Sequence, residues 1–536
     1  MTSVDLGANP LHASADHRSD RSSIAGQNPR HPERRGGTKN RGLLNRRTIL
    51  TAGILAGFGS AMAGEKLDEP VSVSETISLP RFTADPSRPV RVRMEMELHG
   101  NVNVAKDPLV DRKIDLQLPL DSDAVLDFEE FADDRGLAMR FYHQAGCDWR
   151  IDGRRRKTRL RDEVRFTRVN RTSLPETIFS PADYMTRDEV DLLKTPVCSL
   201  AIDGLIPEKI EPNDEPFFPS LEAVAAALNL SSAQSSDVSV RLVAVDEETL
   251  RFQLDGTVEG SAAGVPTEQK VVGKLAYDRN RQLVSWAAIA IHERRTIGVA
   301  EPGFDISATI KMLRRPMDAA VGLVKHPASR TDGDPMMVEI ESKMLRVAAM
   351  MDRRWQPMTD VSGHSVWRMT ENDRSVAQVD LRTLPTLQSG QSWTLEDFVR
   401  DVTKTLGTQM DQILDRKRSI SSSGLEVMTV TATGKAGDVD VRWTLVHLAD
   451  TQGKSPTGRR VQATFTLQSD AIDAFAGSEQ QLASSLRFLD TPIGLAVEPG
   501  ATSDQSGSDS SPEADLKAER PESRKRAALQ SMSDRR

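Results

Sequence analysis

The chain has 536 residues, of which 38% are hydrophobic, 4% aromatic and 28% charged, and its formal net charge is −8. This composition excludes an integral membrane protein and is typical of a soluble, charge-rich chain long enough for two or three domains. Residues 1–63 carry nine Lys and Arg against four Asp and Glu, a net of +5, which leaves about −13 for the rest. An acidic body argues against general nucleic-acid binding.

Residues 45–63, with the sequence NRRTILTAGILAGFGSAMA, predict a signal peptide that follows a disordered polar leader over 1–44. Paired arginines precede a weakly apolar run at 49–60, and Ala61-Met62-Ala63 is a small-x-small pattern that signal peptidase accepts. The apolar run is shorter than the roughly 20 residues that cross a bilayer. We therefore expect cleavage between Ala63 and Gly64 and no transmembrane span in the mature chain.

The export route is left open by the residues around the paired arginines. Arg46 and Arg47 resemble a twin-arginine signal, whereas Asn45 and Ile49 depart from that motif, so the general secretory route is the alternative. Either route delivers the mature chain to the periplasm or the exterior. The sequence thus predicts an exported protein.

Residues 64–324 predict an antiparallel β domain, because apolar and polar residues alternate with period two. In the first such run Val90, Val92 and Met94 alternate with Arg91 and Arg93. Alternation of this kind buries one face of a sheet and exposes the other. Further runs occur at 114–120, 237–245, 250–256, 268–277 and 282–293. Two short helices are predicted at 186–194, with a Thr186–Glu189 capping box, and at 220–229, with Ser220 as N-cap.

The chain holds two cysteines, Cys147 and Cys198, separated by 50 residues. In an oxidising compartment a single disulfide between them is the natural pairing, worth roughly 3–4 kcal/mol if unstrained. The alternative is two unrelated buried thiols that act as small hydrophobic side chains.

A linker is predicted at 325–338, and residues 339–490 predict a second domain with a different pattern. Apolar residues spaced three and four apart predict a helix from Leu395 to about Asp415, with Thr394 and Asp397 at its N-terminus. Strands follow at 425–432, 438–448 and 460–467, and a last helix at 478–488. The tail at 491–536 lacks apolar residues and is predicted to be disordered.

This order of strands, helix, three strands and helix, with ATFTLQSDAIDAF before the last helix, resembles PsbP-like domains. The resemblance implies an α/β/α sandwich, and it implies no particular reaction. The first domain is similar, by strand number and curvature alone, to the half-barrels of LolA-like carriers. The arrangement as a whole resembles exported proteins of planctomycete-type bacteria. The expected fold class is therefore α+β: a strongly curved antiparallel sheet with two short helices, followed by a PsbP-like sandwich.

Residues 150–171 contain ten basic and three acidic residues, the strongest local charge in the sequence. Asp152-Gly153 predicts a hairpin turn that would expose a set of candidate anion-binding side chains: Arg154, Arg155, Arg156, Lys157, Arg159 and Arg161. An anionic glycan, a lipid headgroup or an acidic protein could bind there. The alternative is a solvated hairpin whose bases pair with acidic groups of its own sheet. Nucleic acid is not expected, since only Phe166 could stack on a base.

No catalytic, metal or cofactor motif is complete. HERRT at 292–296 lacks the second histidine of a zinc helix, GHSVW at 363–367 lacks the second glycine of a nucleophile elbow, and ATGKAG at 432–437 lacks the Ser or Thr of a phosphate loop. We expect no cofactor and a non-catalytic binding or interaction protein of the cell envelope. The alternatives are an enzyme whose site is assembled from scattered residues and a purely structural envelope component.

Overall fold

The computed structural model describes residues 71–489, apart from 72, 133–135, 172–173, 175, 213–214, 324–335, 388–392, 451–457 and 476. Of the described residues, 57% lie in strands and 14% in helices. The predicted leader, signal peptide, cleavage point at Ala63–Gly64, most of the linker and the tail lie outside the described residues.

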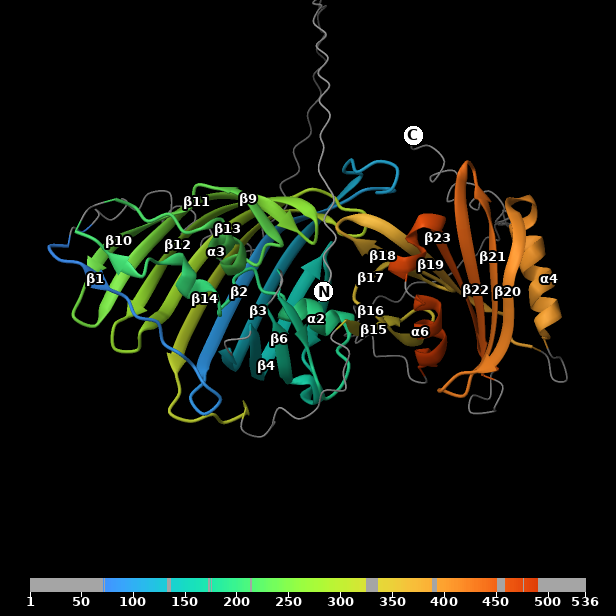
Figure 1. Ribbon diagram of the computed structural model, residues 1–536, viewed down its shortest axis with the longest axis horizontal. Helices are drawn as coiled ribbons and strands as arrows, with labels where there is room; N and C mark the ends of the chain where they lie inside the picture. Colours follow the sequence, from blue (N-terminus) through green and yellow to red (C-terminus); the bar gives the residue numbers. More distant parts are fainter. Residues whose placement is uncertain are drawn as a thin grey trace, which may run out of the picture. The chain divides into compact units, whose positions relative to one another are not determined.

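The largest sheet is built from residues of the first half of the chain (Figure 1). Its main path runs through β10 (Ser239–Val245), β11 (Thr249–Ala262), β12 (Val265–Asp278), β13 (Leu283–Arg295), β14 (Gly303–Pro316), β2 (Val90–Val104), β3 (Leu116–Ala132), β4 (Leu137–Ile151), β6 (Phe166–Asn170) and β7 (Thr177–Phe179). Two further strands lie beside this path, β5 (Arg154–Arg159) next to β4 and β9 (Ser232–Ser236) next to β11. A separate pair is formed by β1 (Ile77–Ser78) and β8 (Lys209–Ile210). All of these pairs are antiparallel, as alternation of period two requires for a sheet with one wet face.

A seven-stranded antiparallel sheet dominates the second half. Its strands follow the order β17 (Trp355–Val361), β18 (His364–Glu371), β19 (Arg374–Leu384), β23 (Arg460–Gln468), β22 (Val439–Ala449), β21 (Glu426–Ala436) and β20 (Met410–Ile420). A three-stranded sheet holds β15 (Met337–Ser342), β16 (Val347–Asp352) and β24 (Arg487–Phe488). The described helices are α2 (Arg187–Leu193), α3 (Leu221–Ala227), α4 (Leu395–Leu406), α5 (Ile472–Phe475) and α6 (Ser478–Ser485), with short 3-10 turns at Asp162–Val164, Ile202–Leu205, Gly407–Gln409 and Ser469–Ala471.

The predicted fold class is wrong. The described chain is mostly β, with several large antiparallel sheets, and its second half is not a PsbP-like α/β/α sandwich. Part of the error is local: the helix predicted to reach Asp415 ends at Leu406, where Gly407 adopts φ 54°, and the following residues form the edge strand β20. The helix content that the sandwich required is therefore replaced by an extra strand.

The predicted helix starts are confirmed. Thr186 accepts a hydrogen bond from the backbone of Glu189 in a capping box at the start of α2, and Ser220 caps α3. Thr394 and Asp397 form the second capping box, at the start of α4. Each cap satisfies backbone N–H groups that the first helical turn leaves without intrahelical partners.

The two faces of the seven-stranded sheet pack differently. One face carries large buried side chains such as Trp355, Trp367 and Phe465, which belong to a hydrophobic cluster that also includes residues of the larger sheet. The other face is covered by α4 only over β20, β21 and β22, where Phe398 and Val402 pack on Trp443. Over β18, β19 and β23 this second face carries polar side chains. This part of the sheet, which α4 does not cover, forms the floor of a cleft.

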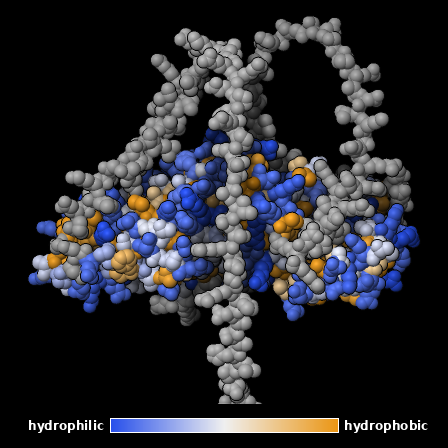
Figure 2. Space-filling view, turned by 90° about the horizontal axis from the view of Figure 1, so that it is seen from above, coloured by the Kyte–Doolittle hydropathy of each residue, from blue (hydrophilic) through white to orange (hydrophobic). Residues whose placement is uncertain are grey.

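In the part of the chain that the structure describes, no helix combines the length and apolar content needed to cross a membrane. Figure 2 shows one side of the molecule, on which hydrophilic side chains predominate and hydrophobic ones form separate small groups. Among the described residues visible in this view, the hydrophobic groups are therefore small and separate.

Candidate functional site

The candidate site is a cleft of about 1260 Å³ whose floor is the polar half of the α4-bearing sheet face. Directly paired residues in an antiparallel sheet lie on the same face. Arg368 of β18 pairs with Gln378 of β19, which pairs with Thr466 of β23, which pairs with Trp443 of β22. This first row of side chains crosses the floor and ends beneath α4.

Two further rows run parallel to the first. Val366, Asp380 and Thr464 form the second row, and His364 and Arg382 begin the third. All five residues line the cleft. The floor thus presents two guanidinium groups, a carboxylate, an imidazole, an amide and two hydroxyl groups, and Val366 is its apolar side chain.

The walls come from segments distant in sequence. On one side stand two loops of the larger sheet, residues 104–112 and 297–302, and on the other the end of α4 with Thr405 and Leu406. The first wall is fixed to the floor at the β18–β19 turn, where Asp373 Oδ1 accepts a hydrogen bond from Val299 N at 2.6 Å. Asp373 also forms an ion pair with Arg112. The cleft therefore exists only when the two halves of the chain pack together.

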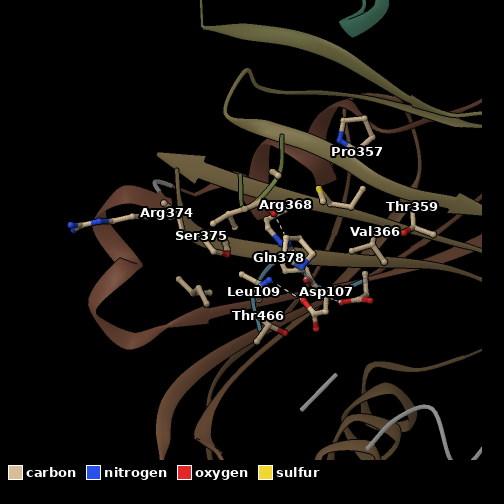
Figure 3. Close-up of a pocket in the computed structure, with 18 of the residues that line it drawn as sticks. Asp107, Leu109, Pro357, Thr359, Val366, Arg368, Arg374, Ser375, Gln378 and Thr466 are labelled. Carbon is tan, nitrogen blue, oxygen red and sulfur yellow. Dashed lines mark hydrogen bonds between the residues drawn. The ribbon is translucent and has the colours of Figure 1, made fainter. Parts of the chain in front are cut away.

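Arg368 is the most unusual side chain of the floor. It is 7% exposed, donates from one Nη atom to Val299 O at 2.6 Å and from the other to Gln378 Oε1 at 3.2 Å. Its Nε is buried and has no hydrogen-bond partner among the described residues. Figure 3 shows Arg368 and Gln378 together in the cleft, with Asp107 and Thr466 beside them, while Arg374 extends away.

Burial lowers the pKa of Arg368, although Asp107 and Asp380 act in the opposite direction. Among the described residues, neither carboxylate forms an ion pair with Arg368. The two hydrogen bonds of Arg368 go to neutral oxygens instead. A guanidinium group remains charged in proteins. A buried cation without a paired anion is unfavourable, and an anionic ligand would remove that penalty.

The middle of the floor is held by Asp380. Its Oδ1 lies 3.2 Å from His364 Nε2, and its Oδ2 accepts a hydrogen bond from Gln378 Nε2 at 3.0 Å. Because Gln378 also accepts from Arg368, a chain of hydrogen bonds links the first row to the third. Asp380 keeps 38% of its side chain exposed, so it can still accept a hydrogen bond from a ligand.

Arg382 lies at the far end of the floor. It donates to Gln462 Oε1 at 2.8 Å, and its Nε is buried with no hydrogen-bond partner among the described residues. Its position repeats that of Arg368: both donate to neutral side-chain or backbone oxygens and both leave one buried N–H unused. The cleft has cationic groups at two ends and a carboxylate between them.

The residues that the sequence singled out lie elsewhere. Arg155, Lys157 and Arg159 of β5 converge on one carboxylate, Asp148, with N–O distances of 3.3, 3.7 and 2.8 Å. Arg156 stacks over the Trp149 ring at 5.4 Å. These contacts are those expected of a hairpin that pairs with its own sheet.

Two of the candidate anion-binding residues differ from the rest. Arg154 is exposed on the hairpin, whereas Arg161 is bound to Glu189 at 2.8 Å and to Asp183 at 3.2 Å. Arg161 therefore ties the end of the hairpin to α2 and is a structural residue. The hairpin retains exposed positive charge, and binding of an anionic surface by Arg154, Arg155, Arg156, Lys157 and Arg159 stays a prediction.

Cys147 and Cys198 are free thiols in this structure. Cys147 Sγ lies 3.1 Å from Ser122 Oγ, and Cys198 Sγ donates to Glu176 Oε2 at 3.3 Å. Burial raises the pKa of the Cys198 thiol to about 12. Each thiol thus lies beside a polar neighbour of its own.

Among the described residues, no group of three or more His, Cys, Asp or Glu side chains is arranged to hold a metal ion. His292 and His364, which stood in the incomplete motifs, each contact one aspartate, Asp305 at 2.9 Å and Asp380 at 3.2 Å. Ser365 Oγ donates to the Thr359 carbonyl and accepts from Trp367 Nε1. It lies in the opposite, buried face and is not positioned as a nucleophile.

Sequence reasoning missed the cleft, although one signal was present. In HSVWRM and SVAQVDLR, the polar residues of β18 and β19 occupy alternate positions, which predicts a wet face on both strands. The pattern does not reveal that loops of the larger sheet cover that face. Only the tertiary structure brings 104–112 and 297–302 to the floor.

Comparisons with known proteins show no family for this chain. No protein-family model and no curated protein matches it. Among solved structures, lipovitellin in a study of lipid–protein interactions is 10% identical, with a TM-score of 0.25, covering 46% of this chain and 28% of its own. OccK11 of Pseudomonas aeruginosa is 10% identical with a TM-score of 0.09, covering 74% of this chain and 98% of its own. The translocator domain of the autotransporter NalP from Neisseria meningitidis is 7% identical with a TM-score of 0.09, covering 78% of this chain and 96% of its own.

Proposed function

We propose that this chain is an exported, non-catalytic binding protein of the cell envelope, and that its cleft binds a ligand carrying an anionic group. The observation that carries the proposal is Arg368, a buried guanidinium group with an unused N–H and no ion-pair partner among the described residues. A carboxylate or phosphate oxygen at that N–H would form a charge-assisted hydrogen bond, which is about twice as strong as a neutral one.

The remaining floor supports binding rather than catalysis. Its side chains are linked to each other by hydrogen bonds, as Asp380 is to His364 and Gln378. Such fixed donors and acceptors suit recognition of polar groups on a ligand. An enzyme whose site is assembled from scattered residues stays the alternative, and among the described residues of the floor it would have to use groups such as Asp380 and His364.

Ligand binding is tested by isothermal titration of the mature protein with acetate, glucuronate, citrate and inorganic phosphate. We expect at least one anion to bind, and Arg368→Gln to reduce its affinity tenfold or more. Arg374→Gln is the matched control, because Arg374 lines the cleft but extends away from its floor. Equal affinity of wild-type protein and Arg368→Gln would contradict the assignment of this residue, and no binding of any anion would contradict the function.

The exported location is a separate part of the proposal and rests on residues 45–64. Mass spectrometry of the native protein should find a chain that begins at Gly64. Replacement of Arg46 and Arg47 by lysine should block export if the twin-arginine route is used. Native protein that retains residues 1–63 would contradict export by either route.

A further inference from the structure

The cleft has a second cationic end, and this constrains the shape of its ligand. Gln378 and Arg382 are four residues apart on β19, so both side chains leave the same face of the strand. At about 3.3 Å per residue they are roughly 13 Å apart along the strand. Arg368 lies directly across from Gln378. The backbone positions of the two arginines therefore lie at opposite ends of one floor, separated by roughly the same 13 Å along the strands.

Each of the two arginines has one N–H group without a hydrogen-bond partner among the described residues. Arg368 Nε and Arg382 Nε are both buried and both without a hydrogen-bond partner in the described part of the chain. A ligand with one anionic group would satisfy one arginine and leave the other buried donor unused. A ligand with two anionic groups satisfies both, and its second contact costs little additional ordering, because the first contact already places it.

The side chains between the two arginines determine which chemical groups the middle of the ligand can carry. Asp380 presents a partly exposed carboxylate, which repels further negative charge and accepts hydrogen bonds. Thr464 pairs with Asp380 on the next strand and Thr466 with Gln378, so each brings a hydroxyl group to the same stretch of floor. A bare hydrocarbon would leave these groups without partners, whereas hydroxyl groups on a ligand would both donate and accept.

We propose that the ligand of this cleft is a hydroxyl-rich molecule with one anionic group at each end, the chemistry of a short oligosaccharide whose two terminal units are uronic acids. The inference rests on the proposed function, because it assigns a ligand class to the same cleft. One carboxylate binds Arg368, the other binds Arg382, and the hydroxyl groups between them donate to Asp380.

The experiment is a titration of the mature protein with glucuronic acid and with linear oligosaccharides of two, three and four units in which only the two terminal units are uronic acids. We expect affinity to rise at least tenfold between the monomer and the trimer or tetramer, where the terminal carboxylates can reach both arginines. Arg382→Gln should remove most of the affinity that the longer oligomers gain over the monomer. Arg368→Gln should weaken all of them, and Arg374→Gln should weaken none. Circular dichroism checks that each variant is folded.

The possible results distinguish a wrong ligand class from a wrong proposed function. Equal affinity for monomer and tetramer, with no effect of Arg382→Gln, would overturn the two-ended ligand and leave the proposed function intact. Equal binding of dodecanedioate, a dicarboxylate without hydroxyl groups, would overturn the hydroxyl-rich middle. Equal binding of neutral maltotetraose, or no binding of any oligomer or simple anion, would overturn the proposed function itself.

Discussion

Asp373 binds the backbone of Val299 across the boundary between the two large sheets, with Asp373 Oδ1 accepting from Val299 N at 2.6 Å. Asp373 lies in the turn between β18 and β19 at φ 59°, and Val299 is 3% exposed in a loop of the larger sheet. The carbonyl of Val299 in turn accepts from Arg368. One loop residue is thus held on both sides by the seven-stranded sheet, and this double contact fixes the wall of the cleft.

Two substitutions of Asp373 distinguish how much its hydrogen bond and its ion pair with Arg112 each contribute to the unfolding free energy. Asp373→Asn keeps an oxygen acceptor for Val299 and should cost less than about 1 kcal/mol, since the ion pair is partly exposed. Asp373→Gly tolerates the positive φ but leaves the buried Val299 N–H without an acceptor, and it should cost about 1–3 kcal/mol. Urea unfolding and hydrogen exchange of the Val299 amide measure both effects. If the glycine variant exchanges no faster than wild type, the contact does not hold the loop.

How far the sequence predicts this fold is clearest at the end of α4. Alternation located the strands, and the Thr394–Asp397 capping box located the start of the helix, because both signals depend only on near neighbours in the chain. The error lies after Gly407. Met410 and Ile413 are three residues apart, a helical spacing, and both pack against the cluster beneath α4.

The structure explains how a strand produces that spacing. The pairing of β20 with β21 is interrupted between Met410 and Gln412 and again between Ile413 and Asp415. A bulge of this kind inserts an extra residue, so that two side chains three residues apart can reach the same face. The apolar pattern of a bulged strand therefore imitates that of a helix, and no local signal except Gly407 separates the two.

The candidate site could not be predicted for a different reason. Arg368, Asp380 and Thr466 reach one floor through strand pairing, and Val299 covers it through a contact across 69 to 74 positions of sequence. Neither the pairing order of strands nor a contact between sheets is encoded in a short window of residues. The strongest charge signal, at 150–171, instead marked a hairpin whose bases gather around Asp148.

Glu129 of β3 holds a distant segment of backbone and should make stability depend on pH. Its buried carboxylate accepts hydrogen bonds from the N–H groups of residues 321–323 at 3.0–3.3 Å and lies 2.6 Å from His143 Nε2. Burial alone would raise the pKa of Glu129, but the bonds from Gly322, His143 and the neighbouring N–H groups outweigh it, and the pKa is lowered. This stabilisation is complete above the usual Glu pKa of about 4.3 and is lost as pH falls through the lowered value.

Glu129→Gln should therefore cost about 1.5–3 kcal/mol of unfolding free energy at pH 7, since it removes a charged acceptor of several hydrogen bonds. The difference from wild type should shrink below about pH 4, where wild type itself becomes protonated. Glu97→Gln, an exposed change on the neighbouring strand β2, is the control. Urea denaturation at pH 7, 5 and 3.5 measures the effect, and a difference that is constant over this range would contradict it.

The two cysteines should differ in reactivity and should not be bridged. Burial raises the pKa of both thiols, but Cys147 is only half-buried, whereas Cys198 is buried and its pKa is raised to about 12, so Cys198 is the less accessible thiol and forms little thiolate at neutral pH. Native protein treated with N-ethylmaleimide should accept at most one label, on Cys147, and protein unfolded without reductant should accept two. Mass spectrometry distinguishes this from the disulfide that the sequence suggested, because a bridged chain would accept no label until it is reduced.

His447 should make the unfolding free energy depend on pH in a second range, which lies at higher pH than the range of Glu129. It is 2% exposed, and its Nε2 accepts a hydrogen bond from Arg460 Nε at 3.0 Å. The ring of Trp393 meets the imidazole edge to face, with 4.8 Å between the ring centroids. Burial, together with the positive charge of Arg460, lowers the pKa of His447 to about 3. The unfolded chain binds a proton at this residue near pH 6.5 while the folded chain does not. The contribution of His447 to the unfolding free energy is therefore fully present above about pH 6.5. It falls toward pH 3, by up to about 1.4 kcal/mol per pH unit.

His447→Gln tests this argument, because glutamine keeps an oxygen acceptor for Arg460 and cannot be protonated. At pH 7 the variant should lose about 1–2 kcal/mol through poorer packing and a weaker hydrogen bond. Between pH 7 and 5, above the range in which Glu129 acts, its unfolding free energy should depend less on pH than that of wild type by up to about 1.4 kcal/mol per unit. His99→Gln, which removes an exposed imidazole from β2, is the control. Parallel curves for His447→Gln and wild type would show that His447 takes up its proton at the same pH in the folded and the unfolded chain, and the acceptor role assigned to its Nε2 would then be wrong.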